Sequence, residues 1–265
     1  MKYKMLNADK YFFRKESTGA GILVIKEFGY QIFLNRTGSV IIDLLKKTTN
    51  TEDVLAALCA LFPSVDESTL KKDLNEILDL FDLYGLIDIN RDQDKYFDSD
   101  ISFGGDADYR MASRFLSNNL KKNKYNFSQV DSIKYFEPVT MRYHSFHNQE
   151  YLVIYRTNGM IQHILLVIPP NGITNVVTIS GSISSKTLKE EDIIHIIKKE
   201  LDFVVAKLPD KINKIRINQI SLCEKENINI VDLFGKLGFI QEAKLTKEIR
   251  DKDLIMFTKY IDGGN

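Results

Sequence analysis

The chain has 265 residues, and its 36 Lys and Arg side chains are balanced by 36 Asp and Glu side chains. A net charge of zero gives no overall field that attracts nucleic acid or an anionic membrane, so we expect neither as a partner. The two cysteines, Cys59 and Cys223, supply neither a disulfide framework nor a thiolate metal site. With no signal-peptide core and no apolar run of membrane-spanning length, we expect a cytoplasmic protein without a bound metal.

The length suits two domains, and the first is predicted to occupy residues 1–90. Apolar runs separated by glycines predict three short strands, at residues 11–13, 22–25 and 30–34. Three helices with one apolar face follow, and each is preceded by a residue typical of an N-cap: Asn35, Asn50 and Asp66. With a closing strand at residues 86–89, this order is that of a winged-helix-like module of three strands and three helices.

An acidic stretch is predicted to link the two domains. Residues 91–108 carry six aspartates and Gly104-Gly105 among few apolar residues, which is typical of a solvated linker. Asp92-Gln93-Asp94 also resembles the opening of a calcium loop, but the glycine and closing glutamate of an EF-hand are missing at the required spacing. We therefore predict a linker at this place.

The second domain, residues 109–265, is predicted to hold a mixed sheet with helices, which makes the chain α+β. A helix over residues 109–122 precedes strands over 141–146, 151–156, 163–168 and 176–182, and Asn158-Gly159 is a strong hairpin signal. An amphipathic helix over 189–208 follows, capped by Ser185 or Thr187. The order ends with a strand over 214–220, a helix over 227–237 with Gly238 as its C-cap, and strands over 239–245 and 254–259.

The first domain resembles the PqqD family. The resemblance covers residues 13–89 and rests on the patterns of residues 34–45, 51–54 and 73–87. PqqD domains are recognition elements for the leader peptides of ribosomally made, post-translationally modified peptides. The resemblance therefore implies that this domain binds a precursor leader peptide.

The third predicted helix argues against DNA, which other winged-helix modules bind. Between Glu67 and Asp82 acidic residues outnumber basic ones, and such a face would repel phosphates in a major groove. By the resemblance, a peptide instead adds as a strand beside the third strand and against the third helix. Leu70, Leu74 and Ile77 suit the floor of such a site, although for most of them a place in the hydrophobic core is the better interpretation. The implied peptide-binding residues are Tyr30, Gln31, Ile32, Phe33, Leu34, Leu70, Lys71, Asp73, Leu74 and Ile77.

The second domain resembles the GNAT acyltransferase family through its last helix. Asn227 stands at the family's Asn, and Lys236-Leu237-Gly238-Phe239 matches its Lys-Leu-Gly-Phe in register. Phe234 stands where the family usually has the Tyr that protonates the departing thiolate of coenzyme A. The resemblance implies a GNAT-like fold and an acyl-CoA cofactor.

In the GNAT family a glycine-rich loop before the long helix holds the pyrophosphate of acyl-CoA, because glycine lets backbone amides approach phosphate. Here the corresponding segment, residues 182–192, has no glycine pair and begins its helix with Glu190, Glu191 and Asp192. Lys186 offers a charge, and the resemblance implies that backbone amides near residues 179–182 polarise the acyl carbonyl. The implied cofactor-binding residues are Ile179, Ser180, Gly181, Ser182, Lys186, Asn227 and Phe234.

Two functions fit these resemblances, both in the biosynthesis of ribosomal peptide natural products. In the first, the GNAT-like domain acylates the peptide that the PqqD-like domain holds, since tethering gives a high effective concentration. In the second, the GNAT-like fold is not catalytic, and the chain is an adaptor that delivers the precursor to a separate peptide-modifying enzyme. No catalytic residue is assigned, and His144 and His147, at i and i+3, suit a metal only on a helix.

Overall fold

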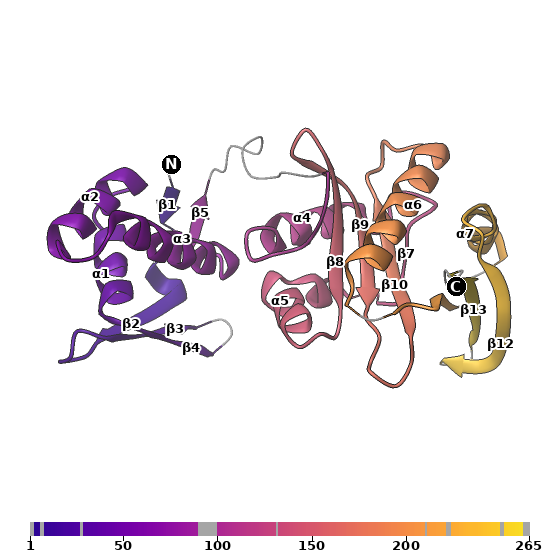
Figure 1. Cartoon of the computed structure of the whole chain (residues 1–265), viewed down its shortest axis with the longest axis horizontal. Coiled ribbons are helices and arrows are strands. Elements are labelled where there is room, and N and C mark those ends of the chain that lie inside the picture. The colour runs from indigo at the N-terminus through magenta and orange to yellow at the C-terminus, as the bar shows by residue number, and fades with distance from the viewer. Residues whose placement is uncertain are drawn as a thin grey trace. The chain divides into compact units, whose positions relative to one another are not determined.

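The structure is a computed structural model that describes residues 3–5, 8–26, 29–89, 100–130, 132–209, 211–220, 224–249 and 252–261. The chain divides into two compact units, Met1–Asp92 and Gln93–Asn265 (Figure 1). Asp92 and Asp94, in the predicted linker, lie outside the described residues, as does Cys223. In the described part of the chain, no helix is both long and apolar enough to cross a membrane.

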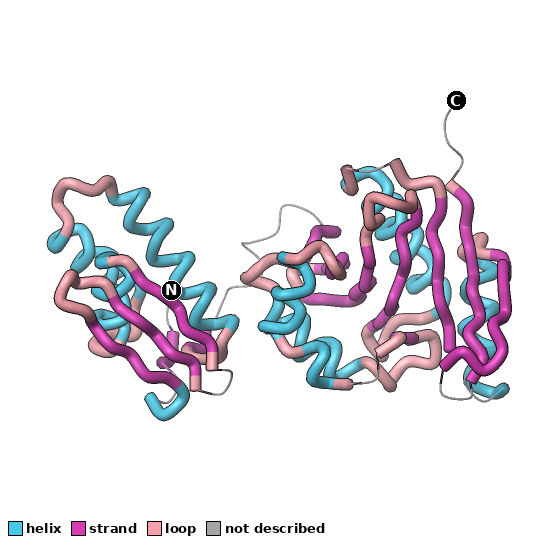
Figure 2. Tube along the Cα trace, turned by 90° about the horizontal axis from the view of Figure 1, so that it is seen from below, coloured by secondary structure: helices cyan, strands magenta, loops and turns pink. Residues whose placement is uncertain are grey.

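The N-terminal unit contains an antiparallel three-stranded sheet of order β2-β3-β4, whose strands lie side by side in Figure 2. The strands are β2 (Tyr11–Lys15), β3 (Gly21–Ile25) and β4 (Tyr30–Leu34). The helices α1 (Arg36–Leu45), α2 (Thr51–Leu61) and α3 (Glu67–Leu83) follow. The predicted closing strand is β5 (Ile87–Ile89), and it pairs with β1 (Tyr3–Met5), a strand that was not expected from the sequence.

All three helices of this unit begin where their predicted caps place them. The side-chain oxygens of Asn35, Asn50 and Asp66 accept hydrogen bonds from the backbone N–H of Gly38, Glu52 and Ser68, at 2.8, 3.3 and 2.9 Å. Each bond satisfies an amide that has no partner within its own helix. The apolar faces then meet over one core, which includes Leu23, Ile42, Leu58, Leu70 and Phe81.

The C-terminal unit is built on one mixed sheet of order β12-β13-β11-β10-β9-β8-β6, with β7 paired to β10. Its strands are β6 (Ile101–Phe103), β7 (Phe127–Ser128), β8 (Tyr151–Thr157), β9 (Met160–Ile168), β10 (Val176–Ser184), β11 (Lys214–Ile220), β12 (Ile240–Ile249) and β13 (Lys252–Tyr260). Its helices are α4 (Tyr109–Asn119), α5 (Pro138–Phe146), α6 (Glu190–Lys207) and α7 (Glu224–Lys236). The predicted α+β class is confirmed.

One pair of neighbouring strands in this sheet is parallel, namely β10 and β11, and α6 connects them. One face of the sheet packs against α6 and α7, through Val153, Leu165, Ile179, Ile197 and Phe234 among others. The hairpin between β8 and β9 turns at Asn158 and Gly159, whose φ angles of 50° and 72° confirm the predicted Asn-Gly turn. Gly238, with φ of 84°, ends α7 as predicted.

Residues 141–146 are helical, so the prediction of a strand there is wrong. They belong to α5, which has Pro138 at its first position and buries Val139 and Met141. Met141 and Tyr143, separated by Arg142, resemble the start of a strand, whereas proline at a first helical position favours the helix. His144 therefore lies in the last turn of α5, and His147 is its C-cap.

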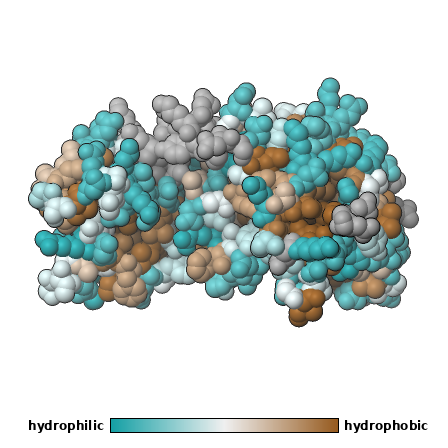
Figure 3. Space-filling view, in the orientation of Figure 1, coloured by the Kyte–Doolittle hydropathy of each residue, from teal (hydrophilic) through white to brown (hydrophobic). Residues whose placement is uncertain are grey.

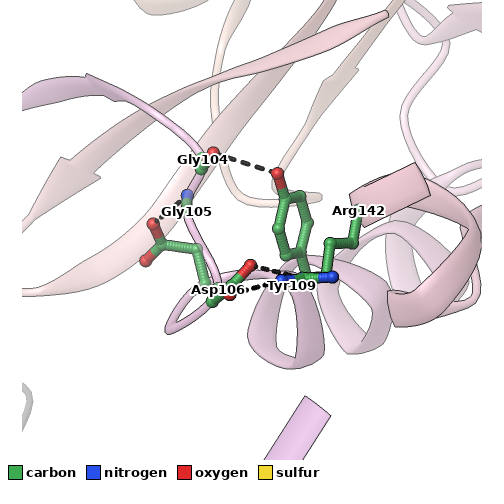
Figure 4. A network of polar contacts seen from close by, with 6 residues as sticks. Gly104, Gly105, Asp106, Tyr109 and Arg142 are labelled. Atoms are coloured by element: carbon green, nitrogen blue, oxygen red, sulfur yellow. Dashed lines mark hydrogen bonds and ion pairs between the residues drawn. The ribbon is translucent and has the colours of Figure 1, made fainter. Parts of the chain in front are cut away.

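Residues 101–108, which the composition assigns to the linker, are instead part of the C-terminal unit. Ile101–Phe103 forms β6 and pairs with β8, and Gly104 to Tyr109 forms the turn into α4 (Figure 4). In this turn Arg142 donates from Nε to Asp106 Oδ1 at 2.8 Å, and the Tyr109 hydroxyl donates to the Gly104 carbonyl at 3.3 Å. The acidic residues of this stretch are paired in the fold, which composition alone does not reveal.

Candidate functional site

Strand β4 forms one edge of the three-stranded sheet. Within the described residues it pairs with β3 alone, so every second backbone amide and carbonyl of β4 points away from the sheet. Tyr30 and Phe33 on this strand are 45% and 76% exposed. An edge of this kind can accept an extended peptide as a further strand.

One stripe of α3 is half-buried, and its last residue lies beside the start of β4. Asp73, Ile77, Leu80 and the capping residue Tyr84 follow helical spacing along this stripe, and all are partly exposed. The Tyr84 ring lies 6.1 Å from the Tyr30 ring between centroids, which ties the end of the helix to the strand. A strand added to β4 would direct every second side chain toward this stripe.

The structure brings only some of the predicted peptide-binding residues to this surface. Tyr30, Gln31 and Phe33 are exposed, and Ile32, Asp73 and Ile77 are half-buried. Leu34, Leu70 and Leu74 are core residues of the N-terminal unit, so they support the surface from behind. Lys71 is exposed, but at 100° per residue it lies roughly 140° around the helix from Tyr84.

Two residues of the α3 stripe were missed in the sequence, Leu80 and Tyr84. Their spacing from Ile77, three and seven residues on, was the available signal. The sequence does not show which apolar stripe of the helix meets the sheet edge.

In the C-terminal unit, the implied acyl-CoA residues surround a place where two strands part. β10 pairs with β11 only from Val176 to Ile179. Beyond that point β7 pairs with β10 instead, with Ser128 opposite Gly181 and Phe127 opposite Ser182. Gln129 then joins the two strands, because its backbone N–H donates to the Ser180 carbonyl at 2.8 Å and its side chain to the Asn218 carbonyl at 3.1 Å.

β7 and Gln129 belong to a longer stretch of chain, residues 119–129, which we call the 119–129 segment. This segment also contacts the loop that leads into α6. Asn126 exchanges two hydrogen bonds with the backbone of Ser184, at 2.7 and 3.2 Å. Asn123 donates to the carbonyls of Ser185 and Leu188, at 3.2 and 3.4 Å. The 119–129 segment therefore forms hydrogen bonds along β10 and along the loop that follows it. This is the place where the GNAT resemblance puts acyl-CoA.

The first turn of α6 is also occupied by contacts from the protein. Its N-cap is Lys189 rather than Ser185 or Thr187, and Asp192 accepts a hydrogen bond from the Lys189 backbone at 3.4 Å. Glu190 accepts a hydrogen bond from the Tyr125 hydroxyl at 2.8 Å and pairs with Lys236. These partners lower the pKa of Glu190, with Lys236 contributing most. Lys186 is exposed beside this turn.

Phe234 lies inside a cluster of aromatic rings. Its ring centroid is 5.1 Å from those of Phe127 and Phe257 and 6.2 Å from that of Phe239. The side chain is 1% exposed. The position that carries a hydroxyl in the resembling family is therefore dry and apolar here; the side chain of Asn227 lies outside the described residues.

Two buried polar groups of three residues lie beside the implied cofactor residues, and neither was foreseen. In the first, Ser182 Oγ lies 2.9 Å from His163 Nε2, and His163 Nδ1 lies 2.7 Å from Glu200 Oε2. The three side chains are connected in the order of a serine–histidine–acid relay. All three are almost completely buried, so a substrate does not reach them. The group instead connects the sheet, through Ser182 and His163, to Glu200 of α6. Burial raises the pKa of Glu200, and the nearby His163 acts in the opposite direction.

The second group is centred on Glu150. Its carboxyl is buried, accepts a hydrogen bond from the Ser180 hydroxyl and is hydrogen-bonded to the Tyr135 hydroxyl. Burial raises the pKa of Glu150, and the two hydroxyls lower it in part. Burial also raises the pKa of Tyr135, with a further increase from the charge of Glu150. No sequence pattern signals either group, because the partners come together only through strand register and helix packing.

Comparison with known proteins supports the first resemblance by sequence. Residues 21–87 match the family described as Coenzyme PQQ synthesis protein D (PqqD), so the predicted PqqD-like domain is confirmed. This match supports a role of the chain in peptide-related biosynthesis. No curated protein sequence matches the chain.

Solved structures of acetyltransferases are similar to the remainder of the chain. Ribosomal-protein-S5-alanine acetyltransferase from Vibrio fischeri has a TM-score of 0.47 at 14% identity, over 64% of this chain and 98% of its own. Spermidine N-acetyltransferase from Vibrio cholerae, in complex with CoA and spermine, has a TM-score of 0.46 at 18% identity, over 62% of this chain and 96% of its own. From β8 to β13 the order of strands and helices in the C-terminal unit is the one that the GNAT resemblance implies.

Proposed function

We propose that this chain binds the leader of a ribosomally made precursor peptide, which pairs with β4 as an added strand. The observation that carries the proposal is the open β4 edge, which presents Tyr30 and Phe33 to solvent. The PqqD match over residues 21–87 supports it, because it covers β3, β4 and α3. The half-buried α3 stripe offers apolar contacts to the side chains that point inward.

We further propose that the C-terminal unit acts as an adaptor, so that the bound precursor is delivered to a separate modifying enzyme, in the cytoplasm. Three features support this role over acyl transfer. The 119–129 segment is bonded along β10 and its loop, Phe234 has no hydroxyl, and Glu190 to Asp192 place acids at the start of α6. Acids in a first turn complement the helix dipole but oppose a diphosphate.

Acyl transfer from an acyl-CoA to a peptide amine is the second candidate. The Lys236-Leu237-Gly238-Phe239 turn favours it, since the Phe239 N–H donates to the Phe234 carbonyl at 2.9 Å and Gly238 has the left-handed backbone of the family pattern. In this candidate the 119–129 segment leaves β10 before acyl-CoA binds.

Hydrogen exchange of the full chain tests peptide binding. The probe is a peptide selected with the full chain from a randomised peptide library. We expect it to protect amides of β4, while amides of β2, the other edge of the same sheet, stay unchanged. A library that yields no binder, or protection confined to other elements, would overturn the proposal.

Calorimetric titration with acetyl-CoA and a long-chain acyl-CoA separates the two candidates. For an adaptor we expect no binding by the wild-type chain. Micromolar binding that Lys186→Glu weakens would replace the adaptor role with acyl transfer, because Lys186 is the exposed cation beside the implied phosphate site.

A further inference from the structure

The face of the three-stranded sheet that points away from the core carries apolar side chains on all three strands. Phe12 lies opposite Val24, and Ile22 lies opposite Phe33, so these four side chains share one face with two polar ones, Arg14 opposite Ile22 and Gln31 opposite Val24. Phe12 is 55% exposed and Phe33 76%, with Val24 and Ile22 half-buried between them. In Figure 2 no described helix crosses this face of β2–β4. Figure 3, in the orientation of Figure 1, shows the side of the N-terminal unit rather than this face, and hydrophobic side chains also gather there around the sheet.

Phe33 differs from Phe12 because it stands on the strand that is open to pairing. The sequence of β4, Tyr30-Gln31-Ile32-Phe33-Leu34, contains neither a charged residue nor a proline. Edges that must stay unpaired usually carry such residues. The contrast is β12, an edge of the large sheet, which carries Lys and Glu side chains and two register shifts. The composition of β4 is that of a strand that another strand covers.

An added strand would place its side chains alternately on the two faces of the sheet. Those on the inner face meet Tyr30, Ile32 and the α3 stripe. On the outer face, the side chain opposite Phe33 would lie about 4.5–5.5 Å away between β-carbons, which is contact distance for a cross-strand pair. It would extend the apolar row formed by Phe33 and Ile22.

We infer that Phe33 is a specificity-determining residue, and that the peptide bound at β4 carries an apolar side chain on its outer face, directly opposite Phe33. This inference rests on the proposed function and names its substrate class. The recognised segment has adjacent apolar residues where it pairs beside Phe33, since both faces of the added strand meet apolar side chains there. A peptide that alternates strictly between apolar and polar residues satisfies only one face.

Phe12→Thr is a matched control for Phe33→Thr. Both residues are exposed phenylalanines on the same sheet face, but two strands separate Phe12 from the open edge of β4. Threonine keeps the strand preference and removes the ring. With the selected peptide and the full chain, we expect Phe33→Thr to weaken binding by about tenfold or more, and Phe12→Thr to leave it within about twofold.

A second arm changes the peptide. Replacing its apolar residues one at a time by Ser should identify one position whose replacement weakens binding to the wild type but not to Phe33→Thr, the signature of a direct pair. Melting curves of both variants establish that they fold. Equal binding by the wild type and Phe33→Thr would overturn the inference while leaving peptide binding intact. Equal losses in both variants would also overturn it, because the whole face, and not the side chain at the open edge, would then determine binding.

Light scattering identifies a competing occupant. If Phe33→Thr converts a dimer into a monomer without changing peptide affinity, a second copy of the chain covers this edge, and the inference is overturned. If the wild type binds no peptide at all, the proposed function itself fails, which is a different result from binding that ignores Phe33.

Discussion

Phe127 packs edge-on against Phe234, with 5.1 Å between the ring centroids. The contact joins β7 to α7, and β7 is the strand that pairs with β10 where β10 and β11 part. One ring thus fixes the 119–129 segment at the place where the GNAT resemblance puts acyl-CoA. Phe234, which lacks the hydroxyl of the tyrosine usual in the GNAT family, therefore packs directly against the strand β7.

Restoring that hydroxyl should destabilise the C-terminal unit. In Phe234→Tyr the added group enters a site that is 1% exposed and surrounded by the rings of Phe127, Phe239 and Phe257. A buried hydroxyl without a partner costs about 1–3 kcal/mol. We expect a loss of that size in the free energy of unfolding, measured by urea denaturation of the full chain.

Phe146→Tyr is the matched control, because Phe146 is 76% exposed and its new hydroxyl would be solvated. We expect this variant to stay within about 0.5 kcal/mol of the wild type. A Phe234→Tyr chain as stable as the wild type would show that the hydroxyl reaches water or a polar partner, and the cluster would then border an open cleft.

The local elements of this fold were predictable where one short signal decides them. Asn35, Asn50 and Asp66 each accept the expected capping bond, and the Asn158-Gly159 turn has the expected backbone. The α5 segment was not predicted correctly, because residues 141–146 are too few to show a helical or a strand period clearly. Pro138 was the signal that favoured the helix.

The polar contacts of the C-terminal unit were not predictable, because their partners are distant in the sequence. Asp108 and Arg156, or Ser182, His163 and Glu200, meet only after the strands have taken their register. For the same reason, the GNAT resemblance places Ile179 to Ser182 near the implied cofactor, but the sequence gives no sign that Ser128 and Phe127 pair with Gly181 and Ser182.

The buried pair of Asp108 and Arg156 should be essential for the C-terminal unit. Its nitrogen and oxygen are 2.7 Å apart, and the Arg156 side chain is 2% exposed. Asp108→Ala leaves a buried guanidinium without its carboxylate, which costs about 3–5 kcal/mol. We expect a loss of that size in the free energy of unfolding.

The neighbouring pair of Asp106 and Arg142 provides the control. It has the same chemistry at 2.8 Å, but both side chains are about two-fifths exposed, at 42% and 39%. We expect Asp106→Ala to cost no more than about 1 kcal/mol. Similar losses in the two variants would contradict the claim that burial, and not pairing alone, makes Asp108 part of the fold rather than of a linker.

The stability of the C-terminal unit should depend on pH through Glu150. Burial raises the pKa of this carboxyl above its ordinary value of 4.5, so the folded chain holds the proton more tightly than the unfolded chain. The contribution of Glu150 to the free energy of unfolding is therefore complete below pH 4.5, and it is lost as the pH rises through the pKa of the folded chain. Glu150→Gln keeps an acceptor for the Ser180 hydroxyl and removes the titration.

We therefore expect Glu150→Gln to gain stability relative to the wild type as the pH rises from about 4.5 to about 8, measured by urea denaturation across that range. Glu248→Gln, at an exposed position of β12, is the control and should show no such trend. A wild type that gains stability relative to Glu150→Gln over the same range would mean that the folded chain favours the carboxylate. The hydrogen bonds from Ser180 and Tyr135 would then outweigh the burial of Glu150.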